Sequence, residues 1–368
     1  MLKTIKTAGV ALLTLATSSQ AMAKDNDNFQ YVVDRFADIE VLRYKVPAFE
    51  DLSLRQKLLI YHLTEAALAG RDILWDQNGK DNLALRDLME NIYINYKGDK
   101  NSADYKAFEK YLKQIWFANG IHHHYSMDKF VPEFSREFLT SQIALLPAEA
   151  RPVNQDTLLT LIFDPSVKPK KVNQAEGHDL ILTSATNIYE GVTQPEVEAY
   201  YAALKDTTDL TPISYGLNTR KVKVDGKVVE QPYKVGGLYT QAIERIVKEL
   251  TLAAGYAENP AQKAYIDKLI EFYTTGDLKT FDDYSILWAE ETASQVDFIN
   301  GFIESYDDPL GMTGSWESIV NFKNNEASAR TETLSGNAQW FEDHSPVNPA
   351  FRKDKVKGVS AKVITAAI

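Results

Sequence analysis

The sequence predicts an α+β protein that is mostly helical and contains a small mixed β-sheet or barrel. Four segments between residues 53 and 146 place apolar side chains at helical spacing, and three of them follow a serine that can cap a helix. Asp225-Gly226 separates two strand-like runs, which is the pattern of a β-hairpin. Residues 296–303 form an apolar run rich in valine, isoleucine and phenylalanine, which is typical of a buried strand.

The composition is that of an ordinary globular protein. The 368 residues suffice for a large core and for two domains, with 44% hydrophobic and 25% charged residues. The formal net charge is −11, and because residues 1–23 carry two lysines and no acid, the remainder carries −13. This charge argues against binding to nucleic acid or to anionic membranes. It mildly favours a cationic ligand such as a peptide amino terminus, although solubility is the better explanation of most of the charge.

Residues 1–23 have the pattern of a secretory signal peptide. A basic start is followed by a short apolar segment over 8–16, and Ala21-Met22-Ala23 fits the cleavage pattern. The apolar segment is too short to span a bilayer. We expect cleavage after Ala23 and export to the periplasm or the medium; the alternative is an uncleaved N-terminal helix. The chain has no cysteine, which excludes a lipoprotein anchor, a disulfide scaffold, thiolate catalysis and cysteine-ligated zinc.

The next segments predict an extended arm and then helices. Alternation over residues 31–44 favours an extended arm or a short strand. Ser53 and Gln56 form a capping-box pattern that opens a helix, which ends near Gly70 or continues to Trp75. Three further helices are expected, over residues 81–97, from Ser102 to Asn119-Gly120, and from Ser135 to Leu146.

Residues 150–235 are expected to be rich in strands. Apolar runs occupy 157–163 and 179–183, and a helix over 193–203 interrupts them. The predicted hairpin pairs residues 214–224 with 227–233. The chain contains no nucleotide-binding glycine pattern, which excludes a phosphate-binding loop at Gly236-Gly237. More helices are expected over 238–254, 260–275 and 284–292, and again after Glu317 to about Trp340.

A polar segment follows the strand predicted at 296–303. Because residues two apart on a strand face the same way, Glu304 and Tyr306 are expected to project side by side. Asp308-Pro309 and two glycines then turn the chain. A carboxylate and a phenol beside such a turn predict a ligand site. The alternative is a strand end whose polar groups cap the turn.

Three adjacent histidines, His122-His123-His124, raise the question of a metal site. Adjacent side chains point in different directions on any regular backbone, whereas metal ligands converge from separated positions. We therefore interpret this segment as a cleft-lining loop in which His123 or Lys129 touches substrate. The isolated histidines are interpreted as structural, namely His62, His178 and His344.

Residues 304–317 read E-S-Y-D-D-P-L-G-M-T-G-S-W-E. They resemble the E-S-Y-x-D-P-x-G-x-x-G-x-x-E signature of the dipeptidyl peptidase III family, the zinc exopeptidases of family M49 that remove dipeptides from peptide N-termini. Residues 116–132 are similar to the N-G-x-H-H-H-Y…K-F-x-P segment of the family's Bacteroidetes-type branch. Residues 36–44, 70–78 and 233–237 fit the same branch, so the resemblance runs from about residue 29 to the last residue.

The resemblance implies a two-lobed fold with a five-stranded β-core in the lower lobe and helices around it. It implies a lower lobe over 24–325 and the start of a helical, zinc-bearing upper lobe over 326–368. Glu304 is expected to help hold the α-ammonium of a peptide substrate. Tyr306 is expected to donate a hydrogen bond to the carbonyl oxygen as negative charge develops on it. The peptide is expected to add to an edge of the β-core.

One feature of the family is missing from the sequence. The family holds its zinc with two histidines of an H-E-x-x-G-H helix and with a later glutamate, and no H-E pair occurs here. The apolar run over 359–368 also has no stop signal. We therefore expect the N-terminal part of an exported zinc dipeptidyl peptidase, inactive alone, that supplies the substrate side of the cleft. One alternative is a non-catalytic periplasmic peptide-binding protein, and another is a hydrolase that uses the histidine triplet.

Overall fold

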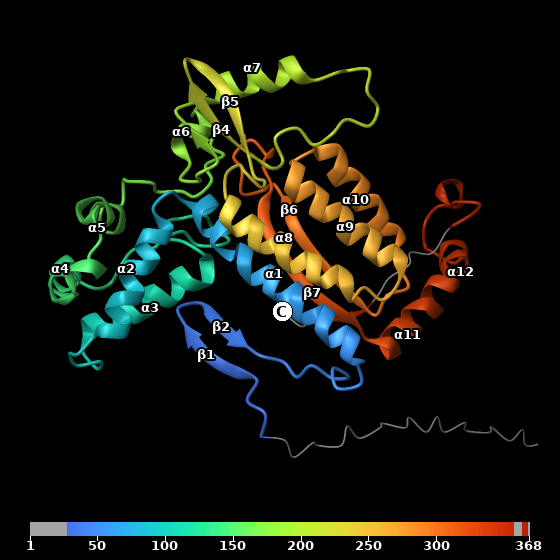
Figure 1. The fold of residues 1–368 in the computed structure, drawn as a ribbon, viewed down its shortest axis with the longest axis horizontal. Coiled ribbons are helices and arrows are strands. Elements are labelled where there is room, and N and C mark those ends of the chain that lie inside the picture. The colour runs from blue at the N-terminus through green and yellow to red at the C-terminus, as the bar shows by residue number, and fades with distance from the viewer. Residues whose placement is uncertain (1–27, 357–362, 367–368) are drawn as a thin grey trace, which may run out of the picture. The chain divides into compact units, whose positions relative to one another are not determined.

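The computed structural model describes residues 28–356 and 363–366, which form helices and small sheets (Figure 1). The chain divides into two compact units, residues 1–44 and residues 45–368. The predicted signal peptide lies outside the described residues. Among the residues that are described, no helix combines the length and the apolar character that a membrane crossing needs.

The described part of the first unit is a β-hairpin. Strand β1 (Val32–Phe36) pairs antiparallel with strand β2 (Ile39–Leu42), and Ala37 adopts a positive φ of 47° in the turn between them. The guanidinium of Arg43 lies over the ring of Phe29, 4.7 Å from its centroid. The extended arm predicted for this region is therefore two short paired strands.

The second unit begins with helix α1 (Leu54–Asn78), which confirms the predicted capping box: the Ser53 hydroxyl accepts from the backbone of Gln56, and the Gln56 side chain accepts from the backbone of Ser53. The helix continues through Gly70. A Cβ at this position would lie 2.0 Å from the ring of Trp316, so the glycine makes room for that ring and does not end the helix. The other helices predicted in this part are α2 (Asn82–Asn95), α3 (Ala103–Ala118) and α4 (Arg136–Leu145).

Two large hydrophobic cores are present in this unit. The first joins α1 to β6, β7 and the helices α8, α9 and α10; α1 packs against the two strands, and α8 lies beside α1 (Figure 1). The second joins α2, α3, α4 and α5 around the fully buried Phe108 and Leu112. The elements named here span α8 (Thr240–Gly255), α9 (Pro260–Thr275), α10 (Leu278–Glu290), β6 (Val296–Glu304), β7 (Ser315–Lys323) and α5 (Gln155–Phe163).

The strands confirm the α+β class and are distributed over small separate sheets. Strand β7 pairs antiparallel with β6 on one side and with β8 (Ile364–Ala366) on the other. The predicted hairpin is confirmed, because β4 (Thr219–Val224) pairs with β5 (Lys227–Pro232) across Asp225-Gly226, both at positive φ. Strand β3 (Tyr189–Glu190) joins β4 in parallel. The expected five-stranded core is thus divided between sheets, and within residues 28–356 and 363–366 no sheet closes into a barrel.

Three local predictions were wrong. The apolar runs at 157–163 and 179–183, expected as strands, are the helices α5 and α6 (Leu180–Thr183), because a short apolar run has no periodicity that separates strand from buried helix. Helix was expected from after Glu317 to about Trp340, but the residues up to Lys323 belong to β7, which pairs with β6. The predicted helix is confirmed from Asn325 onward. The remaining helices are α7 (Gln194–Leu204), α11 (Asn325–Gly336) and α12 (Ala338–Asp343).

Candidate functional site

The β6–β7 turn, residues 305–314, is folded around one buried carboxylate. Asp308 is 1% exposed. The Tyr189 hydroxyl donates to its two oxygens at 2.8 and 2.9 Å. The same carboxylate accepts hydrogen bonds at 2.7–3.2 Å from three amides of the turn, those of Leu310, Met312 and Thr313. The aspartate of the D-P-x-G pattern therefore determines the shape of the turn.

Steric constraints explain why both of these positions in the turn are glycine. Gly311 has a φ of +66°, a left-handed conformation that residues with a Cβ rarely adopt. A Cβ on Gly314 would lie 2.6 Å from the backbone carbon of Phe302, so only glycine allows the end of the turn to approach β6 this closely. The spacing of the motif is thus the spacing that this particular turn requires.

A buried lysine forms hydrogen bonds with the turn and with the segment that leads into β4. Lys221 on β4 is 0% exposed, and its ammonium donates to the carbonyl oxygens of Gly216 at 2.9 Å and Thr219 at 3.1 Å and to the hydroxyl of Thr313. Burial lowers the pKa of Lys221 to about 8, although the charge of Asp308 opposes this shift. The β3–β4–β5 sheet is therefore tied to the turn by polar contacts.

A second buried pair ties the turn to a distant loop. The ammonium of Lys171 lies 2.8 Å from a carboxylate oxygen of Asp307, and both side chains are largely buried. The backbone amide of Lys171 donates to the carbonyl oxygen of Met127 at 2.8 Å. Lys171 thus connects the β6–β7 turn with the segment that carries the histidine triplet.

The C-terminal end of α1 braces the other side of the turn. The Gln77 side chain donates to the carbonyl oxygen of Gly314 at 3.0 Å and accepts from the amide of Trp316 at 2.8 Å. The neighbouring Asp76 accepts from the Tyr239 hydroxyl at 2.6 Å and from the Asn187 amide at 3.0 Å. These contacts account for the polar W-D-Q-N sequence at the end of an otherwise apolar helix.

Three side chains at this supported turn remain accessible. Glu304 is the exposed last residue of β6, Tyr306 is 64% exposed, and Glu317 on β7 is half-buried. Burial raises the pKa of Tyr306, and the charges of Asp307, Glu317 and Glu304 raise it further. Burial and the charge of Glu304 raise the pKa of Glu317, while the Glu304 backbone amide partly offsets this. The two glutamates and the phenol therefore lie close enough to interact.

Two carboxylates beside a phenol O–H are groups that can bind a cation next to a hydrogen-bond acceptor. Neither Glu304 nor Glu317 forms an ion pair with any residue that the structure describes. Two neighbouring carboxylates without a cation repel each other, and a bound ammonium relieves this repulsion. Glu317 was missed as a site residue by sequence reasoning, although it is the last letter of the motif.

The other two predicted residues have different surroundings. The Lys129 ammonium donates to three backbone carbonyl oxygens at and after the end of α5, those of Leu161 at 3.0 Å, Asp164 at 2.5 Å and Val167 at 2.5 Å. The His123 ring accepts from the amides of Tyr125 at 3.0 Å and Ser126 at 3.1 Å within its own loop. The structure thus brings together Glu304 and Tyr306, and it shows local contacts for His123 and Lys129.

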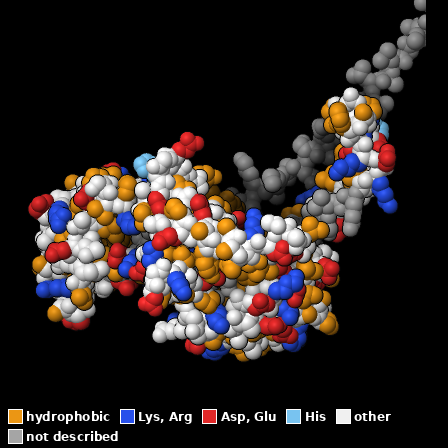
Figure 2. Space-filling view, turned by 90° about the horizontal axis from the view of Figure 1, so that it is seen from above, with side chains coloured by type: hydrophobic (Ala, Val, Ile, Leu, Met, Phe, Trp, Pro, Cys, Tyr) orange, Lys and Arg blue, Asp and Glu red, His pale blue; other side chains and the backbone are white. Residues whose placement is uncertain are grey.

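The described residues do not fit the zinc that the resemblance implies. No group of three or more histidine, aspartate or glutamate side chains among them is arranged to hold a metal ion. The three histidines of the triplet have other contacts. His122 is buried and its Nε2 lies 2.8 Å from the Lys168 carbonyl oxygen, while His123 and His124 stack on each other. On the face drawn in Figure 2, acidic and basic side chains are interspersed.

Comparison with known proteins shows the family to which the chain belongs. The model of peptidase family M49 matches residues 170–360, just over half of the chain, and this range includes the β6–β7 turn. The chain belongs to peptidase family M49. Dipeptidyl peptidase 3 of Nematostella vectensis is 23% identical over 90% of the chain, and that of Homo sapiens is 26% identical over 84%. The chain spans about half the length of these relatives, 51% and 47% respectively.

Solved structures share the fold. The structure of dipeptidyl peptidase III from Caldithrix abyssi matches 87% of this M49 chain with a TM-score of 0.60 at 18% identity. That from Corallococcus sp. strain EGB matches 88% with a TM-score of 0.57, also at 18% identity. The M49 chain covers 49% of each of these structures.

Proposed function

We propose that this chain is the substrate-binding part of an M49 dipeptidyl peptidase and that its β6–β7 turn binds the free amino end of a peptide. One observation carries the proposal. Glu304 and Glu317 lie beside Tyr306 at the end of a strand pair, and neither carboxylate has a cationic partner within the described residues. The family membership and the relatives, which are dipeptidyl peptidases, support the same activity.

The two glutamates hold the α-ammonium of the peptide. A charge-assisted hydrogen bond to a carboxylate is about twice as strong as one between neutral groups. The charge of Glu304 already raises the pKa of Glu317, so a cation at this place lowers that pKa again as it binds. The site thereby reads the amino terminus of the peptide, which is the feature that an enzyme removing N-terminal dipeptides must recognise.

Tyr306 is the hydrogen-bond donor of the site. Its raised pKa keeps the phenol protonated at neutral pH, so the O–H is available to a carbonyl oxygen. Donation to an oxygen that gains negative charge during peptide cleavage accelerates the reaction more than it tightens binding. Zinc, which the resemblance implies for the complete enzyme, would supply Lewis-acid polarisation of the scissile carbonyl there. Because the described residues do not fit a zinc site, this chain is assigned only the binding and orientation of the peptide.

An extended peptide can continue from the amine site along the β6–β7–β8 sheet. Strands β6 and β8 are its two edges, and an added strand pairs through its backbone, which reads length and termini more than side chains. Export through residues 1–23, and a boundary near residue 325 between a lower lobe and a zinc-bearing upper lobe, remain predictions from the sequence. Contact of substrate with His123 or Lys129 also remains a prediction.

Calorimetric titration of the full chain with tetra-alanine and with N-acetyl-tetra-alanine tests the amine site. We expect the free peptide to bind at least about tenfold more tightly, since only it carries an ammonium. Glu304→Gln and Glu317→Gln should each weaken the free peptide about tenfold and leave the acetylated peptide unchanged. Glu326→Gln is the matched control, because this exposed glutamate pairs with Arg330 on α11. Equal affinity of both peptides for the unaltered chain would contradict the proposal.

Tyr306→Phe separates the two parts of the proposal. Affinity for tetra-alanine should change less than about threefold, whereas dipeptide release by the enzyme that contains these residues should fall about a hundredfold. Release is followed by mass spectrometry of the products. Equal losses in turnover and in binding would count against the role of Tyr306 at a developing negative charge. Amine-dependent binding without any dipeptide release would favour the non-catalytic peptide-binding protein.

A further inference from the structure

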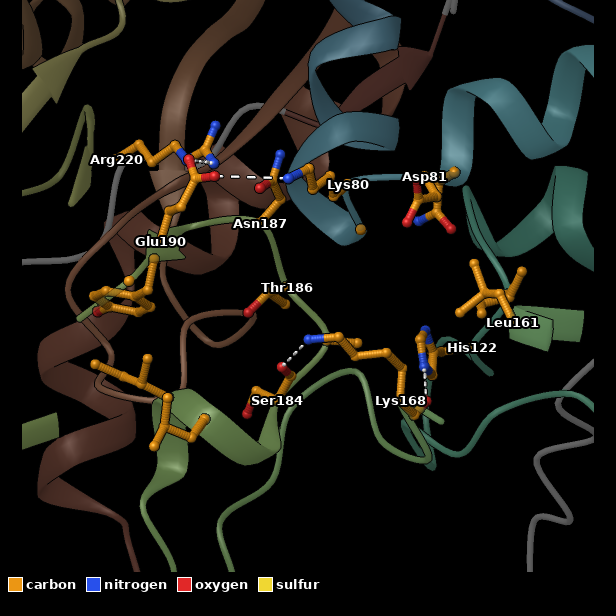
Figure 3. A pocket seen from close by; sticks show the side chains of 18 of the residues that line it. Lys80, Asp81, His122, Leu161, Lys168, Ser184, Thr186, Asn187, Glu190 and Arg220 are labelled. Carbon is orange, nitrogen blue, oxygen red and sulfur yellow. Dashed lines mark hydrogen bonds and ion pairs between the residues drawn. The ribbon is translucent and has the colours of Figure 1, made fainter. Parts of the chain in front are cut away.

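A pocket of about 290 Å³ lies beside β3, and neither Glu304, Tyr306 nor Glu317 lines it (Figure 3). Its walls come from segments far apart in the sequence: the start of α2, the histidine triplet, the end of α5, residues 181–192 and β4. Tyr189 lines the pocket and also donates to Asp308, so the pocket adjoins the support of the β6–β7 turn. Its size suits a ligand no larger than an amino acid or a dipeptide.

The charged side chains around this pocket are only partly paired. Glu190 forms ion pairs with Arg220 and, at 3.6 Å, with Lys80. The two charged residues that remain are Asp81 and Lys168, and neither has a partner of opposite charge among the residues that the structure describes. Figure 3 shows them on different sides of the open space. The pocket therefore presents one unpaired anion and one unpaired cation.

Local hydrogen bonds do not fully engage the charged groups of Asp81 and Lys168. Asp81 is the N-cap residue of α2, yet its carboxylate makes no capping hydrogen bond. The Lys168 ammonium makes a long hydrogen bond of 3.4 Å to the carbonyl oxygen of Ser184. The backbone of Lys168 has a φ of +52°, a conformation that side-chain-bearing residues seldom adopt.

Two buried polar atoms at the pocket also lack a partner. They are Nδ1 of His122 and Oγ1 of Thr186, on side chains that are 3% and 8% exposed. His122 Nε2 lies 2.8 Å from a carbonyl oxygen, which only accepts, so Nε2 carries the proton and Nδ1 is an acceptor. Each buried polar atom without a partner costs about 1–3 kcal/mol, which a ligand N–H or O–H can recover.

The uncharged part of the wall is apolar. Ile121, Leu161 and Ile181 are buried core residues that also line the pocket. Contact with such side chains stabilises a small aliphatic group by the burial of its surface. The lining carries two carboxylates, Asp81 and Glu190, and three cationic side chains, Lys80, Lys168 and Arg220, so a small anion such as phosphate is the competing ligand.

We propose that this pocket binds a zwitterionic α-amino acid, with its ammonium facing Asp81, its carboxylate facing Lys168 and its aliphatic side chain against Ile121, Leu161 and Ile181. The ammonium donates to the Asp81 carboxylate, and its remaining N–H groups are available to other acceptors or to water. This site is separate from the β6–β7 turn, and it does not depend on the peptidase function proposed above.

Calorimetric titration of the full chain with L-leucine, N-acetyl-L-leucine and L-leucinamide tests the site. L-leucine should bind with a Kd on the order of 1 mM or tighter, and each blocked form should bind at least about tenfold more weakly. Asp81→Asn should weaken L-leucine about tenfold without affecting N-acetyl-L-leucine, which has no ammonium to lose. Lys168→Met should weaken L-leucine equally without affecting L-leucinamide, which has no carboxylate.

Matched variants separate this site from others. Asp87→Asn on α2 and Lys170→Met remove a charge from residues outside the pocket lining, and both should leave L-leucine binding unchanged. Glu304→Gln should also leave it unchanged, which distinguishes the pocket from the amine site of the turn. Absence of binding to the unaltered chain would overturn the proposal. So would loss of binding in Glu304→Gln but not in Asp81→Asn, or inorganic phosphate binding more tightly than L-leucine.

Discussion

The β6–β7 turn and the histidine loop, residues 121–131, use buried polar groups in opposite ways. In the turn, the buried groups are Asp308 and Asp307, and the residues beside them, Glu304 and Tyr306, are exposed. In the histidine loop, the groups expected to meet substrate are themselves engaged. Lys129 donates to three carbonyl oxygens, and the His123 ring accepts from two amides of its own loop.

The difference shows what makes a polar side chain available for function. A carboxylate or an ammonium whose hydrogen-bonding capacity is filled by the backbone stabilises the fold and has little left for a ligand. Glu304 and Glu317 keep that capacity because the turn is stabilised by other residues. Availability thus depends on the neighbours of a side chain, which the residue type does not reveal.

The largest expected effect concerns the support of the turn. Asp308→Ala leaves the Tyr189 hydroxyl and three turn amides without their acceptor and Lys221 without its nearby anion. We expect the free energy of unfolding to fall by about 4 kcal/mol, measured by urea denaturation at pH 7. Asp206→Ala is the control, because this exposed aspartate only caps a local turn, and it should cost less than about 1 kcal/mol. Similar values for the two variants would show that the turn does not depend on Asp308.

The histidine loop should respond to acid instead. Burial lowers the pKa of His122 to about 4, and the charges of Lys171, Lys129 and Lys168 act in the same direction. The unfolded chain takes up this proton near pH 6.5, so the unfolded state is favoured as the pH falls from 6.5 toward 4. Stability from this group is complete above pH 6.5, and about 2 kcal/mol of it should be lost by pH 5.

His122→Gln isolates that contribution from the titration of carboxylates. The glutamine amide can still donate to the Lys168 carbonyl oxygen but takes up no proton in this range. Between pH 7 and pH 5, the free energy of unfolding of the unaltered chain should therefore fall about 2 kcal/mol further than that of the variant. Parallel pH profiles for the two proteins would contradict a buried, neutral His122.

A smaller effect distinguishes structural from substrate-binding lysine. Lys129→Met removes three charged hydrogen bonds and should cost about 1–2 kcal/mol of stability, while affinity for tetra-alanine stays within about twofold. Lys170→Met should cost less than about 0.5 kcal/mol, since its pair with Asp128 is exposed. If Lys129 instead touches substrate, as the sequence predicts, peptide affinity would fall with little change in stability.

Local signals made much of the fold predictable. Helix α9 has the predicted bounds, Pro260–Thr275, because proline opens it and Gly276, at a φ of +75°, ends it. The hairpin at Asp225-Gly226 follows from two residues at positive φ, which a tight turn between strands requires. In both cases the residues that determine the structure lie within the element or directly at its ends.

The features that local signals do not reveal depend on partners that are distant in the sequence. Gly70 resembles a helix stop until the ring of Trp316 is seen beside it. Glu317 gains its meaning only when β7 pairs with β6 and places it near Glu304. Lys129 has the charge of a substrate-binding residue, but the carbonyl oxygens that engage it belong to the end of α5 and the residues that follow. The residue types suggest a candidate site. Contacts with distant segments determine which of those side chains keep unused hydrogen-bonding capacity.

The smallest expected effect is the contribution of the Glu317 carboxylate to the pH dependence of stability. The folded chain raises the pKa of Glu317, so it holds this proton more tightly than the unfolded chain does. Stability from this group therefore falls as the pH rises above the usual glutamate value, which is the opposite of the His122 profile. Glu317 is half-exposed and solvent screens it, so Glu317→Gln should change the unfolding free energy by only a few tenths of a kcal/mol between pH 4.5 and 6.

Proton release on binding gives a larger signal from the same group. A peptide ammonium beside Glu304 and Glu317 lowers the raised pKa of Glu317, so tetra-alanine should release protons at pH values just above the usual glutamate pKa, measured by calorimetry in buffers of different ionisation enthalpy. N-acetyl-tetra-alanine should release none, and Glu317→Gln should abolish the release while Glu326→Gln preserves it. A release that persists in Glu317→Gln would assign it to another group. The turn would then support Tyr306 without providing the second carboxylate for the amine.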